Sequence, residues 1–480
     1  MAISLNAMNV AGKPSDPLVE QDAVYKRFTS DERARINEYF VAYLDRELNA
    51  VSESIDDSFS ANGYSYIYNI VKALKLKVME VYWSVTRMMG RAYLHDGTGP
   101  LVEDKPIELR EFGGAMPAFS SPRVYIDCTP TFRSDAKKGM QRVVRNLAVE
   151  GARLGALPVT IANERLISAY TYENHIPAVS VAENDAIVYC EVGPISRLNA
   201  VRARLLRQNV GVIVYDLIPL LFPATQTTYR EHWRPIFEAH LAVAGKLICI
   251  SRSTAQDVVA FARQRPDVIR KGTKIGWMRL GSEPDEIAGE PSAQVKAIAA
   301  AGDFFLAVGT LEPRKGHHVV IDAFETVWRE NGGATLVIVG RRGWRCAGLE
   351  QRIVSHPEFG KRLLWLNDCP DADLDYLYSK TKSLIFASFA EGYGLPLIEA
   401  ARRGAPLIAS DISVFREICG SGASYFTLLD PEDLSRKVGA ALAGEIVSPN
   451  FAIPTWRDAA EDLLMLMRDD PSVADRWIEV

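Results

Sequence analysis

The chain has 480 residues, of which 48% are hydrophobic and 24% charged, and its formal net charge is −5. This composition is ordinary for a soluble globular protein, and the length suits about three domain-sized units, or two large ones with an extension. The negative charge disfavours a general nucleic-acid binder, because such proteins present a basic surface to the phosphate backbone. We therefore expect no nucleic-acid partner.

The six cysteines stand singly in the sequence, without a C-x-x-C pair. We expect reduced thiols in a cytoplasmic protein rather than a disulfide framework or a zinc site. The N-terminus lacks a basic stretch followed by an apolar core, and no apolar run reaches the roughly 18 residues that a membrane span needs. The expectation is a soluble or peripheral protein without a signal peptide.

Residues 1–120 are predicted to form a helical extension that ends in a linker over residues 95–120. Helical spacing of apolar residues predicts helices over residues 31–50 and 66–94. The second of these mixes aromatic and aliphatic side chains with Lys and Arg. It fits a helix packed on the main body or on a second subunit, which we favour because amphipathic helices usually face a core. The alternative is a helix lying on an anionic membrane surface.

From residue 121 onward, short apolar runs alternate with longer helical stretches, which is the pattern of a parallel sheet covered on both faces. Residues 121–290 are predicted to form a first Rossmann-like domain. Its expected strands are residues 123–127, 157–161, 186–190, 211–215, 246–250 and 274–278.

A second set of strands predicts another Rossmann-like domain over residues 300–454, after a polar hinge over residues 281–302. Its expected strands are residues 304–308, 334–339, 362–366, 383–387, 406–409 and 423–426. The final segment, residues 455–480, is predicted as a helix that either stays with this domain or crosses back to the first. The expected fold class is α/β, with two doubly wound parallel sheets facing a cleft, where such sheets bind ligands.

Two carboxylates flank a glycine-rich turn in the sequence EGYGLPLIE, residues 391–399. A strand is expected before this turn and a helix after it, so free backbone N–H groups and the helix dipole would face a ligand such as a diphosphate. Glu391 would lie in the loop and Glu399 in the helix, where they could contact two parts of an elongated ligand. On spacing alone, a helix with one acidic residue before it and another on its solvated face is an equal alternative.

A basic pair follows the first strand of the second set, in the sequence GTLEPRKGHH, residues 309–318. Arg314 offers a planar fork and Lys315 a point charge, and both suit a leaving diphosphate. The alternative is a surface pair beside a loop. The presence of the 391–399 segment in the same predicted sheet favours the phosphate site.

Together, GTLEPRKGH and FASFAEGYGLPLIEA resemble the retaining glycosyltransferases of family 4, which have the GT-B fold. The segments VGRRGW, LNDCPDADLDYLY, ASDISVFREICG and DPEDL resemble that family at matching points of the second domain. In the first domain, residues 138–147, 215–220 and 249–254 are similar to its glycine loop and to two of its strand ends. The resemblance covers about residues 121–470 and leaves residues 1–120 outside.

This resemblance implies a role for each motif residue. Arg314 and Lys315 would hold the donor diphosphate, Glu391 would bind sugar hydroxyls, and Glu399 would bind the ribose. A glycine at position 139 would let the first-domain loop approach the diphosphate without a Cβ clash. Gly139 is thus an expected donor-binding residue. The others are Thr310, Arg342, Trp344, Asn367, Gly392, Tyr393, Gly394 and Leu395.

The chain departs from the family pattern at two positions. Many members have Arg at position 310, where this chain has Thr310, so Arg314 and Lys315 would bear more of the phosphate contact. Many also have His where this chain has Tyr215. The neighbouring Asp216 would then orient the sugar or the acceptor, and we include it among the catalytic candidates with Glu391, Arg314 and Lys315.

In this family the donor phosphate is thought to act as the base, so catalysis would consist of stabilising the leaving diphosphate and positioning the reactants. No metal and no other cofactor is expected. The sequence Asp371-Ala372-Asp373 has the D-x-D spacing of metal-binding transferases. Because a helical pattern follows it, Asp371 is better explained as a helix N-cap.

The function implied is transfer of a hexose, best mannose from GDP-mannose, to a hydroxyl of a lipid-linked oligosaccharide in bacterial surface polysaccharide synthesis. A polyprenyl-linked acceptor would bring this cytoplasmic protein to the inner membrane, with residues 66–94 as the contact or as a homodimer interface. A UDP-sugar donor, or another GDP- or dTDP-deoxysugar, is an alternative, because motifs do not fix base and sugar. A non-catalytic scaffold is another, since Tyr215 and Thr310 depart from the pattern.

Overall fold

The structure is a computed structural model. It describes residues 122–134, 139–162, 165–168, 181–193, 205–222, 230–283, 289–330, 332–445 and 447–478, together with parts of 29–46. The predicted helix over residues 66–94 and the linker over 95–120 lie outside the described residues. None of the described helices is both long enough and apolar enough to cross a bilayer.

The first unit is built on an eight-stranded sheet with the order β14-β7-β6-β5-β4-β1-β2-β3. Its parallel strands are β1 (Val124–Asp127), β2 (Leu157–Ala162), β4 (Ala186–Tyr189), β5 (Val210–Val214), β6 (Lys246–Cys249) and β7 (Lys274–Trp277). Each strand predicted for this unit forms, with small shifts at its ends. The two antiparallel edge strands, β3 (Arg165–Ser168) and β14 (Trp477–Ile478), were not predicted.

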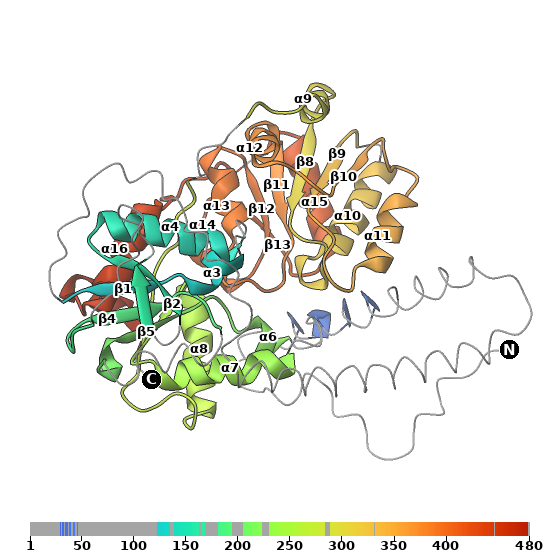
Figure 1. The fold of residues 1–480 in the computed structure, drawn as a ribbon. Coiled ribbons are helices and arrows are strands. Elements are labelled where there is room, and N and C mark those ends of the chain that lie inside the picture. The colour runs from blue at the N-terminus through green and yellow to red at the C-terminus, as the bar shows by residue number, and fades with distance from the viewer. Residues whose placement is uncertain are drawn as a thin grey trace, which may run out of the picture.

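Helices of the first unit flank this sheet (Figure 1). They are α3 (Thr129–Ser134), α4 (Met140–Arg153), the 3₁₀ turn η4 (Arg207–Asn209), α6 (Ile218–Leu221), α7 (Arg230–Val243) and α8 (Arg252–Gln264). The start of α8 is fixed by Ser251, whose side chain accepts a hydrogen bond from Thr254 N and so satisfies one of the free N–H groups of the first turn.

The second unit is a six-stranded parallel sheet with the order β10-β9-β8-β11-β12-β13. The strands are β8 (Phe304–Val308), β9 (Thr335–Val339), β10 (Leu363–Leu366), β11 (Ser383–Phe386), β12 (Leu407–Ser410) and β13 (Ser424–Phe426). Its helical elements are α9 (Ala293–Ala300), η6 (Pro313–Lys315), α10 (His317–Arg329), α11 (Ala347–Val354), α12 (Asp371–Lys380), α13 (Leu395–Arg402), α14 (Ser413–Cys419) and α15 (Pro431–Leu442). Two doubly wound sheets, the GT-B arrangement, are thereby confirmed.

The predicted hinge over residues 281–302 was too long, because its second half is α9. Ser292 caps α9, and its N and Oγ donate to the carboxylate of Asp373 at 2.6 and 2.8 Å. Since α9 also packs on α12, this half of the segment is attached to the second unit. The hinge is therefore confined to the residues before Ser292.

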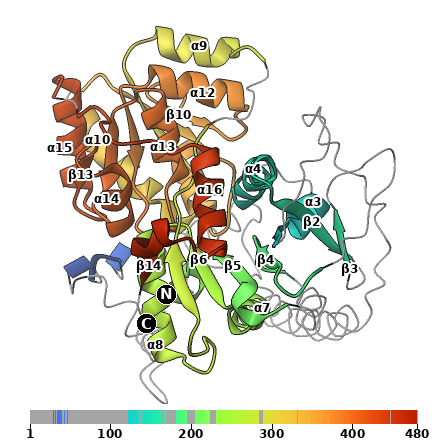
Figure 2. The same cartoon turned by 90° about the vertical axis from the view of Figure 1, so that its left-hand side faces the viewer.

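The end of the chain returns to the first unit. Helix α16 (Trp456–Met467) begins with a capping box between Thr455 and Asp458, and it packs on α4 and β6 (Figure 2). The short η7 (Pro471–Arg476) follows, and β14 then pairs with β7. Buried Lys246 donates to Met467 O at 2.5 Å, which fixes the end of α16 over the sheet.

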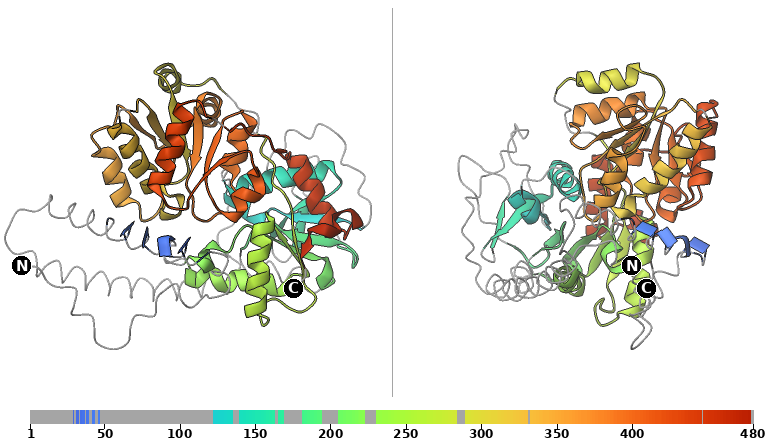
Figure 3. Two further views of the ribbon diagram at one scale, coloured as in Figure 1. Left: turned by 180° about the vertical axis from the view of Figure 1, so that it is seen from behind. Right: turned by 90° about the vertical axis from the view of Figure 1, so that its right-hand side faces the viewer.

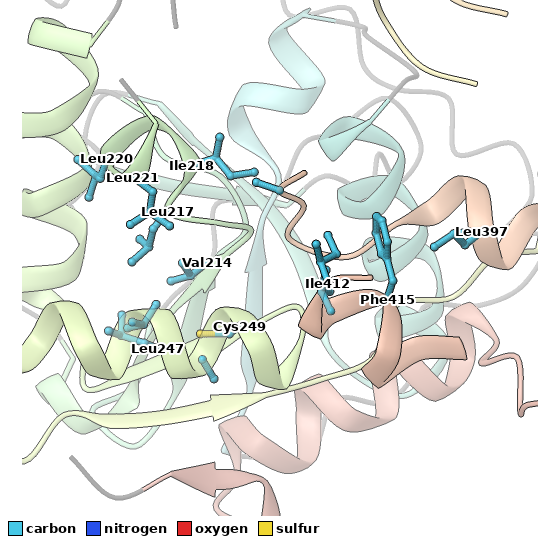
Figure 4. Packing of buried hydrophobic residues seen from close by; sticks show 14 of the residues in the cluster. Val214, Leu217, Ile218, Leu220, Leu221, Leu247, Cys249, Leu397, Ile412 and Phe415 are labelled. Atoms are coloured by element: carbon cyan, nitrogen blue, oxygen red, sulfur yellow. The ribbon is translucent and has the colours of Figure 1, made fainter. Parts of the chain in front are cut away.

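One buried apolar cluster extends across both units. Figure 4 labels members of this cluster from the first unit, among them Val214 and Leu217, and from the second, namely Leu397, Ile412 and Phe415. Figure 3 shows the ribbon of the two units from behind and from the side. Burial of apolar surface where the two units meet favours the observed relative placement of the two sheets.

Candidate functional site

Arg314 and Lys315 lie in the turn η6, which follows β8 and is held by close backbone contacts. Gly316 has a φ of 67°, and a Cβ there would lie 2.3 Å from Ala387 O, so only glycine lets this turn pass beneath the end of β11. The side chain of Lys315 folds back over Gly309. A Cβ built on Gly309 would lie only 3.2 Å from Lys315 Cδ. The turn η6 thus presents Arg314 and Lys315 beside the next loop of the sheet.

The loop after β11 is held against the first unit at Gly392. A Cβ on this residue would lie 1.9 Å from Tyr215 O, at the end of β5. The carbonyl of Gly392 accepts hydrogen bonds from Ser251 Oγ at 2.7 Å and Thr254 Oγ1 at 3.2 Å. Gly392, one of the expected donor-binding residues, is therefore also a point of close backbone contact between the two units.

Glu391 is clamped by the two cations predicted to hold phosphate. Its Oε1 lies 2.6 Å from Arg314 Nη1 and 2.6 Å from Lys315 Nζ, and its side chain is 12% exposed. Burial by itself raises the pKa of Glu391, but Arg314 and Lys315 outweigh that effect and hold the pKa at about 2. The carboxylate is consequently ionised at any physiological pH.

Arg314 has further partners that fix its orientation. Its Nη2 lies 2.5 Å from Glu312 Oε1, and its Nη1 donates to Ala390 O at 2.9 Å. Burial favours loss of the proton of Arg314. The carboxylates of Glu391, Glu312 and Asp216 outweigh this effect and raise the pKa of Arg314 above its ordinary value. A permanent guanidinium charge, held in place before any ligand arrives, suits electrostatic stabilisation of a developing anion.

Asp216 lies immediately beyond β5, where the structure brings it close to the Glu391–Arg314 group. Its Oδ1 accepts from Ile218 N at 2.8 Å. Burial raises the pKa of Asp216, and the charge of Arg314 partly offsets that rise. Burial also raises the pKa of Tyr215. Its hydroxyl is buried without a hydrogen-bond partner among the residues that the structure describes.

Glu399 is bound from both units. Its Oε1 accepts from Arg142 Nη1 at 2.6 Å, and its Oε2 accepts from Tyr378 Oη at 3.1 Å. Arg142 belongs to α4 of the first unit and also donates to Glu283 O at 3.3 Å. Sequence reasoning gave Arg142 no role of its own, although it lies within the 138–147 motif, and it did not single out Tyr378.

Three of the expected donor-binding residues follow neighbouring strands, with Arg342 and Trp344 in the loop after β9 and Asn367 after β10. Leu311 forms a parallel bridge with Arg342, and Asn367 Oδ1 accepts from Arg342 N at 3.1 Å. Arg342 also pairs with Glu350, and its side chain is 64% exposed. The loop that carries Trp344 is therefore adjacent to the loop that carries Arg314 and Lys315.

Three other predicted donor-site residues contribute to the local geometry of the two loops. The carbonyl of Thr310 faces the ring of His317 at 3.4 Å. Gly394 has a φ of 130°, and its position before α13 requires glycine. Buried Tyr393 donates through its hydroxyl to Leu280 O at 3.1 Å, which ties the loop to the first unit.

Gly139 is exposed and precedes α4 with a φ of 61°. No described protein atom lies within 4 Å of a Cβ built there, so the space beside Gly139 is open on the protein side. The positive φ still favours glycine at this position.

Asp371 is not an N-cap, contrary to the expectation from sequence. Helix α12 begins at Asp371 after Pro370, and no side chain caps it. Asp371 and Asp373 instead occupy the first turn, where their negative charge complements the helix dipole. Among the described residues, no group of three or more His, Cys, Asp or Glu side chains is arranged to hold a metal ion.

Comparison with known proteins decides the family of the second unit. Residues 290–452 match the family described as Glycosyl transferases group 1. The chain carries a domain of this glycosyltransferase family. The resemblance indicated by the motifs is thereby confirmed, and α9 to β13 with α15 are the elements of this glycosyltransferase domain.

Several curated proteins are similar to the chain. The serotype-specific mannosyltransferase WbdA of Escherichia coli is 32% identical over 378 residues, which cover 71% of this chain and 46% of that protein. The O-antigen chain mannosyltransferase B of Escherichia coli is 31% identical over 174 residues, covering 35% of this chain and 42% of that protein. The chain thus spans about half the length of the curated relatives it matches.

Solved structures are similar at low identity. Anabaena Alr3699/HepE in complex with UDP and glucose has a TM-score of 0.48 at 16% identity, covering 74% of this chain and 98% of that one. The trehalose-6-phosphate synthase OtsA has a TM-score of 0.49 at 12% identity, covering 72% of this chain and 94% of that one.

Proposed function

We propose that the protein is a retaining glycosyltransferase that moves a hexose, best mannose from GDP-mannose, to an acceptor hydroxyl. The observation that supports this best is the Glu391 carboxylate clamped by Arg314 and Lys315, within a glycosyltransferase domain. Two relatives named mannosyltransferases support the choice of mannose.

The clamp explains how a donor would be bound. The diphosphate competes with Glu391 for Arg314 and Lys315, because phosphate oxygens offer the same bidentate and point-charge contacts. Glu391 then loses its partners and becomes available to accept from sugar hydroxyls. In the same way, ribose hydroxyls donate to Glu399, which Arg142 and Tyr378 hold in place.

The chemical step needs no protein nucleophile in this proposal. The bond between the anomeric carbon and the phosphate oxygen breaks, and a bond to the acceptor oxygen forms on the same face of the sugar. The acceptor's proton passes to the departing phosphate. Arg314 and Lys315 stabilise the negative charge that grows on the diphosphate, and Asp216 orients the sugar or acceptor.

The acceptor we propose is a polyprenyl-linked oligosaccharide at the inner face of the membrane, in surface polysaccharide synthesis. Support comes from the relative whose name places it on the O-antigen chain. The protein would be cytoplasmic and attached peripherally during transfer. We propose that neither a metal ion nor another cofactor takes part.

The test is a thermal-shift screen with GDP, UDP, GDP-mannose, UDP-glucose and UDP-N-acetylglucosamine, each with and without Mg²⁺. A ligand that binds only the folded state raises the apparent melting temperature. Shifts with GDP and GDP-mannose alone, unchanged by Mg²⁺, are expected. Shifts with uridine ligands alone would replace the donor and keep the mechanism, and no shift with any ligand would favour a scaffold.

Two variants, compared in a transfer assay, test the role of Glu391 directly. Glu391→Ala is expected to abolish transfer, because it removes the carboxylate proposed to accept from the sugar hydroxyls. Glu461→Ala removes a carboxylate that is 41% exposed and pairs only at the surface with Arg457, so transfer should persist. Equal activity of both variants would contradict the proposed role of Glu391.

A further inference from the structure

A helix from outside both sheets packs on the donor side of the second unit. The described residues within 31–46, here called the N-terminal helix, are helical. Ile36 and Tyr43 on this helix are 0% and 1% exposed. Figures 1 and 3 show the segment, in blue, beside α6 and next to the second sheet. Such complete burial means that the helix contributes to the structure of the unit it covers.

Tyr39 contacts the loop that carries the basic pair. Its hydroxyl donates to Pro313 O at 2.9 Å, and Pro313 immediately precedes Arg314. Its ring also lies edge-on to Phe389, with centroids 6.1 Å apart. Since Phe389 N donates to Arg314 O at 3.1 Å, Tyr39 contacts both sides of the junction between the two donor loops.

Tyr43 contacts the next loop of the same site. Its hydroxyl donates to the carbonyl of Arg345, the residue after Trp344. Arg345 has a φ of 51°, which is uncommon for a residue other than glycine and needs support from its surroundings. The ring of Tyr43 packs edge-to-face on His318 in the first turn of α10, with centroids 5.2 Å apart.

The same contacts continue into the first unit. Phe389 packs edge-to-face on Phe222, which follows α6, with centroids 5.3 Å apart. The rings of Tyr39, Phe389 and Phe222 therefore form a row that joins the N-terminal helix, the second unit and the first.

We propose that Tyr39 and Tyr43 are positioning residues of the donor site. They hold the carbonyls of Pro313 and Arg345, so that Arg314, Lys315 and the Trp344 loop are arranged for a nucleoside diphosphate before it binds. The inference deepens the proposed function and rests on it. It assigns a part of the donor site to the extension that the resemblance does not cover.

A purely structural role would give a different result from a positioning role. If the helix only covers apolar surface, loss of a hydroxyl lowers stability and leaves ligand affinity unchanged. If it fixes the loops, the loss also weakens nucleotide binding, because part of the binding free energy must then order the loops. Affinity for GDP and UDP, measured beside melting temperature, separates the two roles.

The experiment compares Tyr39→Phe and Tyr43→Phe with Tyr125→Phe in the full chain. Tyr125 is a fully buried tyrosine in β1 of the first unit, as buried as Tyr43, and its hydroxyl donates to Asp185 Oδ2 at 2.7 Å. GDP and UDP are titrated into each protein by calorimetry. The dissociation constant of whichever nucleotide the unaltered protein binds is expected to rise about three- to ten-fold in the first two variants and to stay the same in the third.

Unchanged affinity in both Tyr39→Phe and Tyr43→Phe would overturn the inference, as would an equal loss in Tyr125→Phe. If one of the two variants does not fold, the other decides the outcome. Hydrogen exchange over residues 309–318 gives a second readout, expected to be faster in Tyr39→Phe than in Tyr125→Phe. Failure of the unaltered protein to bind either nucleotide would instead contradict the proposed function.

Discussion

Arg142 Nη1 lies 2.6 Å from Glu399 Oε1 and so joins α4 of the first unit to α13 of the second. The two side chains are 21% and 16% exposed, so the pair is largely protected from water. Glu399 is the residue expected to bind ribose. Placement of the first unit therefore affects the orientation of the Glu399 carboxylate, which we propose binds the donor.

Replacement of Arg142 tests this coupling. In Arg142→Ala, Glu399 keeps only Tyr378 as a partner, and a carboxylate that lacks its cation is less well oriented. We expect the dissociation constant for the donor nucleotide to rise about ten-fold. Arg153→Ala is the matched control, because Arg153 is on the same helix, is 47% exposed and pairs with Glu150. Equal affinity in the two variants would refute the coupling.

Removal of Lys315, one of the two cations proposed to bind the diphosphate, should act mainly on turnover. In Lys315→Met the leaving diphosphate loses a charge that is 13% exposed and already held by Glu391. The turnover number at saturating donor is expected to fall about a hundred-fold or more, as when one oxyanion donor is removed. Lys296→Met, which removes a 50% exposed side chain on α9, serves as the control in a transfer assay.

The low pKa of Glu391 predicts a pH-dependent stability. Its folded pKa is about 2 against an ordinary value of 4.5, so the Arg314–Lys315 clamp stabilises the protein above pH 4.5 and loses effect as the pH falls toward 2. The full effect is on the order of 3 kcal/mol. Chemical denaturation should show that the gap in unfolding free energy between the unaltered protein and Glu391→Gln shrinks from pH 6 to pH 3. A gap that is constant with pH would contradict the clamp.

The close approach at Gly392 predicts a position that does not tolerate a side chain. A Cβ there would lie 1.9 Å from Tyr215 O, and backbone on both sides must move to accept it. Gly392→Ala should lower the unfolding free energy by about 1–3 kcal/mol and also reduce transfer. In Gly439→Ala the added Cβ meets no atom within 4 Å inside α15, so this variant should be stabilised by up to about 1 kcal/mol. Calorimetric melting of the two variants gives the comparison.

Local sequence was enough to predict the two parallel sheets. Strands such as β5 and β8 are continuous apolar runs because both of their faces are covered, and this pattern needs no knowledge of distant residues. Strand β14 could not be found in the same way. It consists of Trp477 and Ile478 alone, and it forms only because α16 carries the end of the chain back to β7.

In the candidate site, too, some features were predictable from local sequence and others depend on the tertiary structure. Arg314, Lys315, Glu391 and Glu399 were found from spacing and resemblance, because a strand, a glycine turn and a helix place them within short stretches of chain. The pairing of Glu391 with both cations was not predicted, since it joins two loops that neighbouring strands bring together. The N-cap expected at Asp371 was wrong because helix start signals leave the first residue uncertain.

The sequence by itself thus determined the α/β class, the two sheets, the glycine turns and the basic and acidic residues at the strand ends. These follow from apolar periodicity and backbone freedom, which act over a few residues. Only the tertiary structure decided that Arg142 reaches Glu399, that Gly392 meets Tyr215, and that Tyr39 supports the loop of Arg314. Those contacts join residues far apart in the chain, and they depend on how buried surfaces fix the two units and the N-terminal helix against one another.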